Sequence, residues 1–219
     1  MKTTAVEGPV VVYGASGHGK VVADILRANS IEVEGFVDDD PLKHSNVYGL
    51  KILGNTKWLV ERTVRQPVAV ALGVGDNFFR RRVAEHCIAA GAHLMTAIHP
   101  SATVAASATV SPGTVIMPHA VVNADAVIGQ GAIINTAAIV EHDCRIGNFA
   151  HLSPKVAVGG NVRVGDFAWL GIGSTVIPNH KVGTGSIIGA GATVIHDIDD
   201  WVVAVGTPAR TLKKLTPQN

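Results

Sequence analysis

Three consecutive residues, Glu141, His142 and Asp143, carry side chains suited to proton transfer. A histidine imidazole accepts a proton near neutral pH, and a neighbouring carboxylate can orient the ring and raise its basicity. Such a pair suits acyl transfer to an amine, in which a base removes a proton as nitrogen attacks a thioester. By itself the tripeptide fits an ordinary solvated turn better than a catalytic site, so the elements that position it must decide between the two interpretations.

A six-residue repeat surrounds this tripeptide. Every sixth residue from Ile98 to Val194 is Ile, Leu or Val, a period that neither an amphipathic helix nor a single strand produces. The residue four positions later is usually small. Glycine often follows the aliphatic residue directly, where we expect the backbone to turn at φ values that favour glycine. The pattern predicts a β-solenoid, in which three short strands and three turns form one triangular coil of 18 residues.

The coil length predicts which residues stack on His142. Residues 18 apart lie in adjacent coils, so Ala124 and Gly160 flank the histidine, and both leave room beside the imidazole. Glu141 has Gly159 as its neighbour, and we expect the N–H groups of this glycine pair to reach a developing oxyanion. A histidine in such a hollow, beside free N–H donors, is a candidate active site.

The chain before Ile98 follows a different pattern. An apolar run at 10–13 leads into a glycine turn at 14–19, and apolar residues at helical spacing follow in 20–29. The next expected elements are a strand ending at Val37, a helix over 56–63, a strand over 68–72 and a helix through 79–88. Strands alternating with helices predict a small parallel sheet, about half of a full dinucleotide-binding fold. We therefore expect a Rossmann-like α/β half domain at 1–97 and a β-helix with a C-terminal tail at 98–219.

Polar residues gather where the predicted parallel strands end. At the glycine turn, backbone N–H groups and the helix dipole favour a phosphate, although a plain helix N-cap explains the serine there equally well. The acidic residues after the second strand stand where such folds hydrogen-bond a ribose or a base. The predicted nucleotide-binding residues are Ser16, Gly17, His18, Asp38, Asp39 and Gly73.

Composition narrows the class of protein. A formal net charge of +1, with 16% charged residues, predicts no binding to nucleic acid or to an anionic membrane. The two cysteines, Cys87 and Cys144, argue against a disulfide scaffold. No leader segment or long apolar run is evident, and the mean hydropathy of +0.30 reflects Val and Ala in the repeat. We expect a cytoplasmic enzyme.

The hexapeptide pattern resembles the left-handed parallel β-helix of bacterial acyltransferases, and the handedness comes from that resemblance. The whole chain resembles the family of nucleotide-amino-sugar N-acetyltransferases, which acetylate UDP- or GDP-linked 4-amino-4,6-dideoxy sugars for cell-surface glycans; sialic-acid O-acetyltransferases are related. The motifs that carry the resemblance are Tyr13–Gly19, Val37–Asp39, Asn135–Thr136 before Glu141–His142, Gly159–Asn161 and Gly206–Arg210.

The resemblance implies a role for each matching residue. His142 would be the general base, Asp143 the carboxylate that raises its basicity, and Gly160 the N–H donor to the thioester oxygen. Some relatives have Glu where this chain has the shorter Asp143. The backbones of Ile172 and Ala190 would contact the pantetheine arm. The implied acetyl-CoA-binding residues are Asn135, His151, Gly171, Ile172, Ala190, Gly206, Pro208 and Arg210. Relatives pack three prisms side by side, which implies a homotrimer.

Four alternatives stay open. A sugar or sialic-acid O-acetyltransferase differs only in the acceptor, and neither the base nor the acceptor group can be identified from these residues. A zinc hydratase of the γ-carbonic-anhydrase type would need three histidines; here His142 and His151 lie nine residues apart and the close His-x4-His pair is absent. We therefore expect no metal. A nucleotide-sensing scaffold would bind nucleotide without acetyl-CoA turnover. An NAD-dependent oxidoreductase would need the second half of the sheet.

Overall fold

The computed structural model describes residues 8–40 and 46–218. The chain forms two compact units that divide between Pro100 and Ser101, three residues beyond the boundary predicted from the repeat. Parts of the two predicted domains, residues 1–7, 41–45 and 219, lie outside the described residues.

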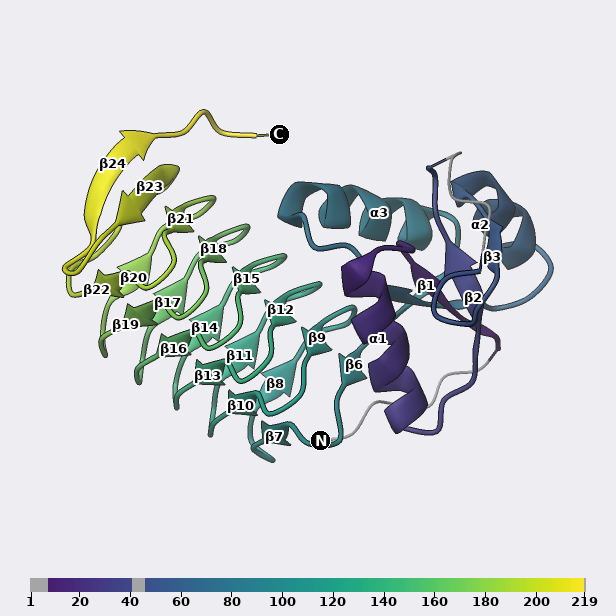
Figure 1. Ribbon diagram of the computed structural model, residues 1–219, viewed down its shortest axis with the longest axis horizontal. Coiled ribbons are helices and arrows are strands. Elements are labelled where there is room, and N and C mark those ends of the chain that lie inside the picture. The colour runs from purple at the N-terminus through teal and green to yellow at the C-terminus, as the bar shows by residue number, and fades with distance from the viewer. Residues whose placement is uncertain (1–7, 41–45, 219) are drawn as a thin grey trace. The chain divides into compact units, whose positions relative to one another are not determined.

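The first unit contains a five-stranded parallel sheet of order β3-β2-β1-β4-β5, with helices in its connections (Figure 1). The central strands β1 and β4 are buried throughout, which explains why both read as continuous apolar runs. The elements are β1 (Val10–Tyr13), α1 (Gly17–Ala28), β2 (Val33–Val37), β3 (Ile52–Gly54), α2 (Thr56–Thr63), β4 (Ala69–Leu72), α3 (Asn77–Ala89), β5 (His93–Met95) and β6 (Ala97–Ile98).

Two predictions for this unit need correction. Helix α1 begins at Gly17 and not at Lys20, because Ser16 already has the extended backbone of an N-cap and the glycines belong to the first helical turn. The edge strands β3 and β5 were not predicted. Both have only three residues and are not fully buried, so neither carries a continuous apolar run.

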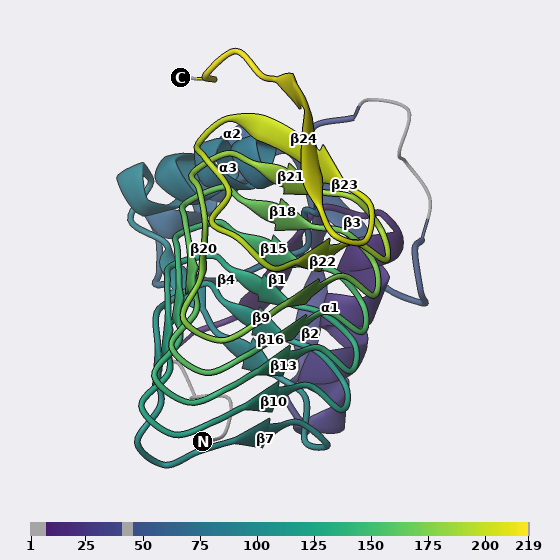
Figure 2. The same cartoon turned by 90° about the vertical axis from the view of Figure 1, so that its left-hand side faces the viewer.

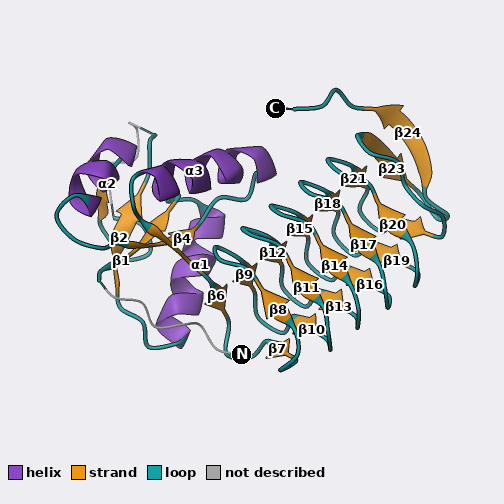
Figure 3. Cartoon of the chain, turned by 180° about the vertical axis from the view of Figure 1, so that it is seen from behind, coloured by secondary structure: helices purple, strands orange, loops and turns teal. Residues whose placement is uncertain are grey.

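The second unit is a left-handed parallel β-helix built from two-residue strands, which alternate with turns along the whole repeat (Figure 3). Its strands form three faces. The first face contains β7 (Thr103–Val104), β10 (Val121–Val122), β13 (Ile139–Val140), β16 (Ala157–Val158), β19 (Thr175–Val176) and β22 (Thr193–Val194). The second face contains β8 (Thr109–Val110), β11 (Val127–Ile128), β14 (Arg145–Ile146), β17 (Arg163–Val164) and β20 (Lys181–Val182). The third face contains β9 (Val115–Ile116), β12 (Ile133–Ile134), β15 (His151–Leu152), β18 (Trp169–Leu170), β21 (Ile187–Ile188), β23 (Val202–Val205) and β24 (Arg210–Lys214).

The predicted coil of 18 residues is confirmed by the strand register. Val121 pairs with Ile139, and Ile139 pairs with Ala157, so each strand lies over the one 18 residues earlier; Figure 2 shows β7, β10, β13 and β16 stacked in this way. The predicted aliphatic residue is the second of each strand and points into the prism. Leu152 and Leu170, for example, are fully buried.

The predicted role of the glycines is wrong. The glycines that directly follow the aliphatic residue do not have positive φ; the left-handed backbone lies two residues further on and recurs every six residues, often at non-glycine residues such as Asn161 (φ 56°). Glycine is needed for a different reason. A Cβ on Gly147 would lie 2.5 Å from the amide nitrogen of Asp166 in the next coil, so the close approach of two backbones excludes a side chain.

The C-terminal end differs from the repeat. Strand β24 runs antiparallel to β23, a hairpin that the hexapeptide period did not predict because the period ends at Val194. Among the described residues, no helix has both the length and the apolar character needed to cross a membrane.

Candidate active site

His142 and Asp143 lie at the corner of the coil between β13 and β14. Asp143 has a left-handed backbone (φ 61°), a conformation that aspartate tolerates better than most residues. This conformation lets two consecutive side chains meet, and Nδ1 of His142 lies 2.8 Å from Oδ2 of Asp143. The hydrogen bond to Asp143 raises the pKa of His142, with smaller opposition from desolvation. Because Nδ1 faces the carboxylate, Nε2 is the nitrogen left to act as a base.

Gly160 lies directly over the imidazole in the next coil. A Cβ on this residue would come within 2.6 Å of Cε1 and 2.7 Å of Nε2 of His142. The N–H of Asn161 donates to the His142 carbonyl at 2.9 Å, which holds the two coils in this register. Within the described residues, the Gly160 N–H has no hydrogen-bond acceptor. A free N–H next to a basic nitrogen can stabilise an oxyanion that forms there.

A polar contact below the histidine was not predicted. Nδ2 of Asn123 donates to Oε2 of Glu141 at 2.9 Å, and the Glu141 charge adds to the raised pKa of His142. Asn123 stands 18 residues before Glu141, so the stacking rule that placed Gly160 beside His142 would also have found this pair.

Asn135 and His151 meet on the third face. Asn135 Oδ1 accepts the Thr136 N–H, so its amide nitrogen faces the ring and donates to Nε2 of His151 at 3.0 Å. The ring of His151 stacks on Trp169, with centroids 5.8 Å apart, and the Trp169 indole N–H donates to Ser153. Asn135, His151 and Trp169 thus form one ordered cluster on this face.

The other residues predicted to bind acetyl-CoA lie at a different corner from His142. Ile172, which is 59% exposed, and Ala190 occupy equivalent turns of adjacent coils between the third and first faces; the N–H of Gly191 donates to the Ile172 carbonyl. Gly171 lies under this pair, since a Cβ on it would be 2.7 Å from the Ala190 nitrogen. Gly206, Pro208 and Arg210 lie at or next to the β23–β24 hairpin turn. Within one chain, these residues do not meet His142.

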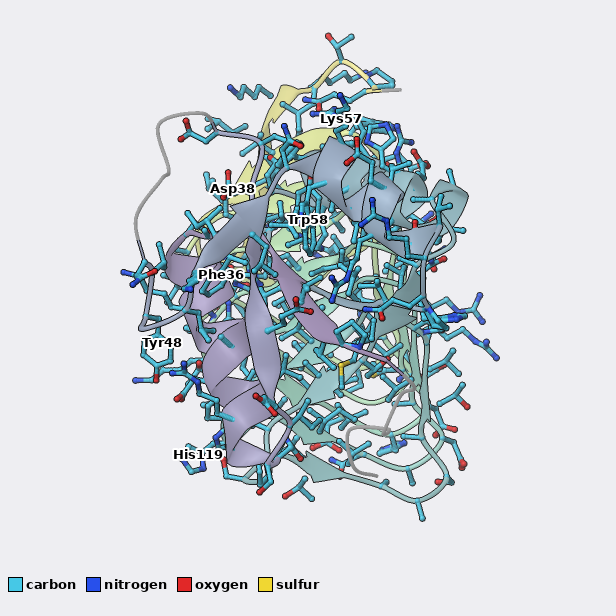
Figure 4. All side chains as sticks on the ribbon, turned by 90° about the vertical axis from the view of Figure 1, so that its right-hand side faces the viewer. Phe36, Asp38, Tyr48, Lys57, Trp58 and His119 are labelled. Atoms are coloured by element: carbon cyan, nitrogen blue, oxygen red, sulfur yellow. The ribbon has the colours of Figure 1, made fainter. Side chains whose placement is uncertain are left out.

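In the first unit, a cavity of about 320 Å³ opens at the carboxyl ends of β1, β2 and β4. Four of the predicted nucleotide-binding residues line it: Ser16, Asp38, Asp39 and Gly73. Figure 4 labels Asp38, which comes just after β2, and Phe36 within that strand. Gly17 and His18 are in the first turn of α1 and are not among the lining residues. Burial, and secondarily the nearby Arg80, lowers the pKa of His18 to about 4, so its ring is neutral at pH 7.

The two aspartates also organise the cavity walls. Asp38 accepts the N–H groups of Ala15 at 2.7 Å and Asp40 at 3.0 Å. Asp39 accepts the N–H of Thr56 at 2.8 Å and the hydroxyl groups of Thr56 and Tyr13. Each carboxylate therefore joins neighbouring elements in addition to facing the cavity.

The N-terminus of α1 lacks a side-chain cap. Its N-cap, Ser16, makes no side-chain cap hydrogen bond, whereas the corresponding Asp76 of α3 accepts from the N–H of Phe79. Gly19 must be glycine, because a Cβ there would collide with the Gly14 carbonyl. Ser16 and Gly17 are exposed, and a Cβ added to Gly17 would meet no atom within 4 Å. An open helix N-terminus of this kind suits an anion.

Arg80, a residue that the sequence did not single out, is fully buried behind the loop that follows β4. A buried arginine cannot be recognised from an exposed-looking run such as Arg80-Arg81-Arg82. Among the described residues, no group of three or more His, Cys, Asp or Glu side chains is arranged to hold a metal ion.

Comparisons with known proteins identify a matching family model and several related enzymes. The family model of the PglD N-terminal domain matches residues 9–87. The chain is 39% identical over 107 residues to the UDP-N-acetylbacillosamine N-acetyltransferase of Bacillus subtilis; the match covers 48% of this chain and spans 50% of that enzyme's length.

Several solved structures match almost the whole chain, including structures of two acetyltransferases. One is a histidine-to-asparagine variant of perosamine N-acetyltransferase from Caulobacter crescentus in complex with CoA and GDP-perosamine. It has a TM-score of 0.91 and 39% identity, and the match covers 95% of this chain and 99% of that one. The other is the acetyltransferase domain of PglB from Neisseria gonorrhoeae with acetyl coenzyme A, with a TM-score of 0.88 and 38% identity over 94% of this chain and 100% of that domain.

Proposed function

This chain belongs to the family of nucleotide-amino-sugar N-acetyltransferases, and from that premise we propose that it transfers the acetyl group of acetyl-CoA to the amine of a nucleotide-linked amino sugar. The observation that carries the proposal is the His142 imidazole, which is held by Asp143 and packs against Gly160, whose N–H has no acceptor among the described residues.

The proposed mechanism uses these three groups in sequence. Nε2 of His142 removes a proton from the amine as its nitrogen forms a bond to the thioester carbonyl carbon. Asp143 stabilises the resulting imidazolium, and the Gly160 N–H donates to the oxyanion of the tetrahedral intermediate. When the intermediate collapses, the carbon–sulfur bond breaks, the amide forms, and the imidazolium returns its proton to the leaving thiolate of CoA.

The first unit is proposed to bind the nucleotide part of the sugar substrate. The cavity at the strand ends combines the uncapped N-terminus of α1, which suits the diphosphate, with acidic side chains that suit ribose or base donors. Asp39 accepts three hydrogen bonds and keeps acceptor capacity for this, because a carboxylate offers about four lone-pair sites.

Acetyl-CoA is proposed to lie along the β-helix, and a homotrimer would complete its site. Ile172 and Ala190 occupy one corner of the prism and His142 another, so one chain does not bring them together. The first face supports such an assembly. Its outward residues are uncharged, among them Val121, Ile139 and Ala157, while the second face carries Arg145, Arg163 and Lys181.

We place the enzyme in the cytoplasm, where we expect both substrates to be available.

The test is a screen of UDP- and GDP-linked 4-amino-4,6-dideoxy sugars with acetyl-CoA. We expect release of free CoA thiol together with a mass increase of the sugar nucleotide by one acetyl group. The corresponding nucleotide sugars without the amine are the control. Acetylation of a hydroxyl group in these controls, together with no reaction at the amine of the amino sugars, would contradict N-acetyl transfer and favour the O-acetyltransferase alternative.

A further inference from the structure

The loop between β4 and α3 contacts a buried guanidinium. Arg80, on the first turns of α3, donates from Nη1 to the carbonyl oxygens of Val74 at 3.2 Å and Gly75 at 2.8 Å. Its Nη2 donates to Oδ1 of Asn77 at 2.9 Å. Burial lowers the pKa of Arg80 to about 9, and the nearby Asp76 carboxylate opposes this shift, so the group remains charged at neutral pH.

These bonds determine where the loop amides point. In a trans peptide unit, the carbonyl and the following N–H point in opposite directions, and these peptide bonds are trans. With the Val74 and Gly75 carbonyls turned inward to Arg80, the N–H groups of Gly75 and Asp76 must turn away from it. Gly75 is partly exposed and Asp76 is exposed, so this direction leads out of the core.

The same loop lines the cavity of the first unit. Gly73, Val74 and Gly75 form one wall, opposite the aspartates that follow β2. Within the described residues, the N–H groups of Gly75 and Asp76 donate to no acceptor. Two adjacent N–H groups that both turn away from the buried side of a loop can donate to the same anion, and Gly75 lines the cavity.

We propose that Arg80 is a positioning residue of the nucleotide-sugar site, which turns the Gly75 and Asp76 amides toward the cavity so that they bind the substrate diphosphate together with the N-terminus of α1. The inference rests on the proposed function, because it takes the cavity as the nucleotide site. It adds a second group of donors and the buried side chain that orients them.

The residue type matters for this role. The planar fork of arginine can reach two carbonyl oxygens and an amide oxygen at once, whereas a lysine ammonium is a point charge on a flexible stem. A buried cation behind the loop also offsets the negative charge of Asp38, Asp39 and Asp40, which would otherwise oppose an anionic ligand in this cavity.

Arg80→Met and Arg80→Lys test the proposal by binding measurements that do not require turnover. UDP and GDP, with uridine and guanosine, are titrated against the full-length protein by calorimetry, or by ligand-observed NMR where binding is weak. In wild type the nucleoside diphosphate should bind more tightly than its nucleoside. In Arg80→Met we expect this advantage to fall about tenfold or more, the usual effect of losing hydrogen bonds to a charged group, while nucleoside affinity changes little. Arg80→Lys should recover part of the advantage.

Arg81→Met is the matched control, since it removes the same charge one residue along the helix, where Arg81 pairs with Glu85. This variant should leave the ratio of nucleoside diphosphate affinity to nucleoside affinity unchanged. The KM for acetyl-CoA and the melting temperature report on folding. A folded Arg80→Met protein that keeps the full diphosphate advantage would overturn the inference, as would equal losses for nucleoside and nucleoside diphosphate. A wild type that binds neither UDP nor GDP would overturn the nucleotide site itself. Binding of UDP or GDP without acetyl transfer would overturn only the proposed function.

Discussion

Gly160 and His142 are packed so closely that any side chain at position 160 would enter the space of the imidazole: a Cβ there would lie 2.7 Å from Nε2. The coil itself does not require glycine at this point of the turn. Equivalent turns, six residues apart, carry Pro154, Asp166 and Ile172. The histidine therefore explains the glycine, and the two residues form one site.

Gly160→Ala should abolish most activity while the protein still folds, because the added methyl group displaces the imidazole from the Asp143 carboxylate and from the reacting amine. We expect a loss of kcat of about 10² or more, comparable with removing a general base. Steady-state kinetics with circular dichroism of the purified variant checks this.

The control is the double variant His142→Ala/Gly160→Ala. Removing the ring creates space for the methyl group, so any loss of melting temperature caused by Gly160→Ala should disappear in the double variant. If the alanine at position 160 lowers the melting temperature equally with and without the His142 ring, then residue 160 is constrained by the backbone and not by His142.

His142→Asn should lower kcat by about 10² or more with a nearly unchanged KM for acetyl-CoA, since asparagine cannot accept the amine proton. The matched control is His180→Asn, a histidine on the same β-helix that bonds to the Pro178 carbonyl; its turnover should be close to wild type. Normal turnover by the His142 variant at neutral pH would reject the proposed mechanism.

Asp143→Asn should change the pH dependence of the reaction. The Asp143 hydrogen bond raises the pKa of His142, and the base is active only after it loses its proton. Activity in wild type therefore rises with pH through this raised pKa. Without the carboxylate the pKa falls, so the acidic limb of the kcat profile should move to lower pH, with a smaller maximum than in wild type because the ring is less basic. If the acidic limb of the kcat profile stays in place in Asp143→Asn, then Asp143 does not determine the pKa of His142.

Asp39→Asn should destabilise the first unit at neutral pH. Burial raises the pKa of Asp39, but its bonds from the Thr56 N–H, from Tyr13 and from the Thr56 hydroxyl outweigh this and lower the pKa below 3.8. The stability from these bonds is fully present above pH 3.8 and is lost as the pH falls through the lower native pKa. We expect the free energy of unfolding of Asp39→Asn to be about 1 kcal/mol lower than that of wild type at pH 7, as measured by denaturant unfolding. This difference should become smaller as the pH falls below 3.8.

Tyr13→Phe distinguishes the Tyr13 bond of Asp39 from its Thr56 bonds, since it removes the Tyr13 hydroxyl donor and keeps both bonds from Thr56. It should retain most of the pH-dependent stability that Asp39→Asn loses. A pH-independent difference between wild type and Asp39→Asn would mean that the charge of Asp39 plays no part.

Light scattering should find a trimer, and Ile139→Glu should dissociate it. Ile139 is 37% exposed on the first face, where a buried carboxylate would be unpaired. Arg163→Glu, on the charged second face, is the control and should leave the trimer intact. A wild-type monomer at micromolar concentration would contradict the assembly and the shared acetyl-CoA site with it.

The sequence by itself was sufficient to predict the β-helix. Each hexapeptide repeats the same local choice, an aliphatic residue directed inward and a small residue near the corner, so the period can be recognised without knowing any distant contact. The same period located His142 beside Gly160, because neighbours in a regular solenoid are a fixed number of residues apart.

Other features were beyond that reasoning. The left-handed backbone at Asp143, which brings its carboxylate to His142, lies at a turn position that the glycine pattern had placed two residues earlier. The short strands β3 and β5 lack a periodic signal, because edge strands bury too little to need continuous apolar residues.

The tertiary structure alone decided the details of the first unit. Arg80 is one of three consecutive arginines in the sequence, and only the packing of α3 against the sheet determines which of them is buried. Asp38 and Asp39 were predicted as ligand contacts, yet their bonds to Ala15, Tyr13 and Thr56 depend on strands and helices that are distant along the chain. A periodic sequence specifies neighbours by counting, whereas in an irregular α/β unit neighbours follow from how the elements pack, which no local pattern encodes.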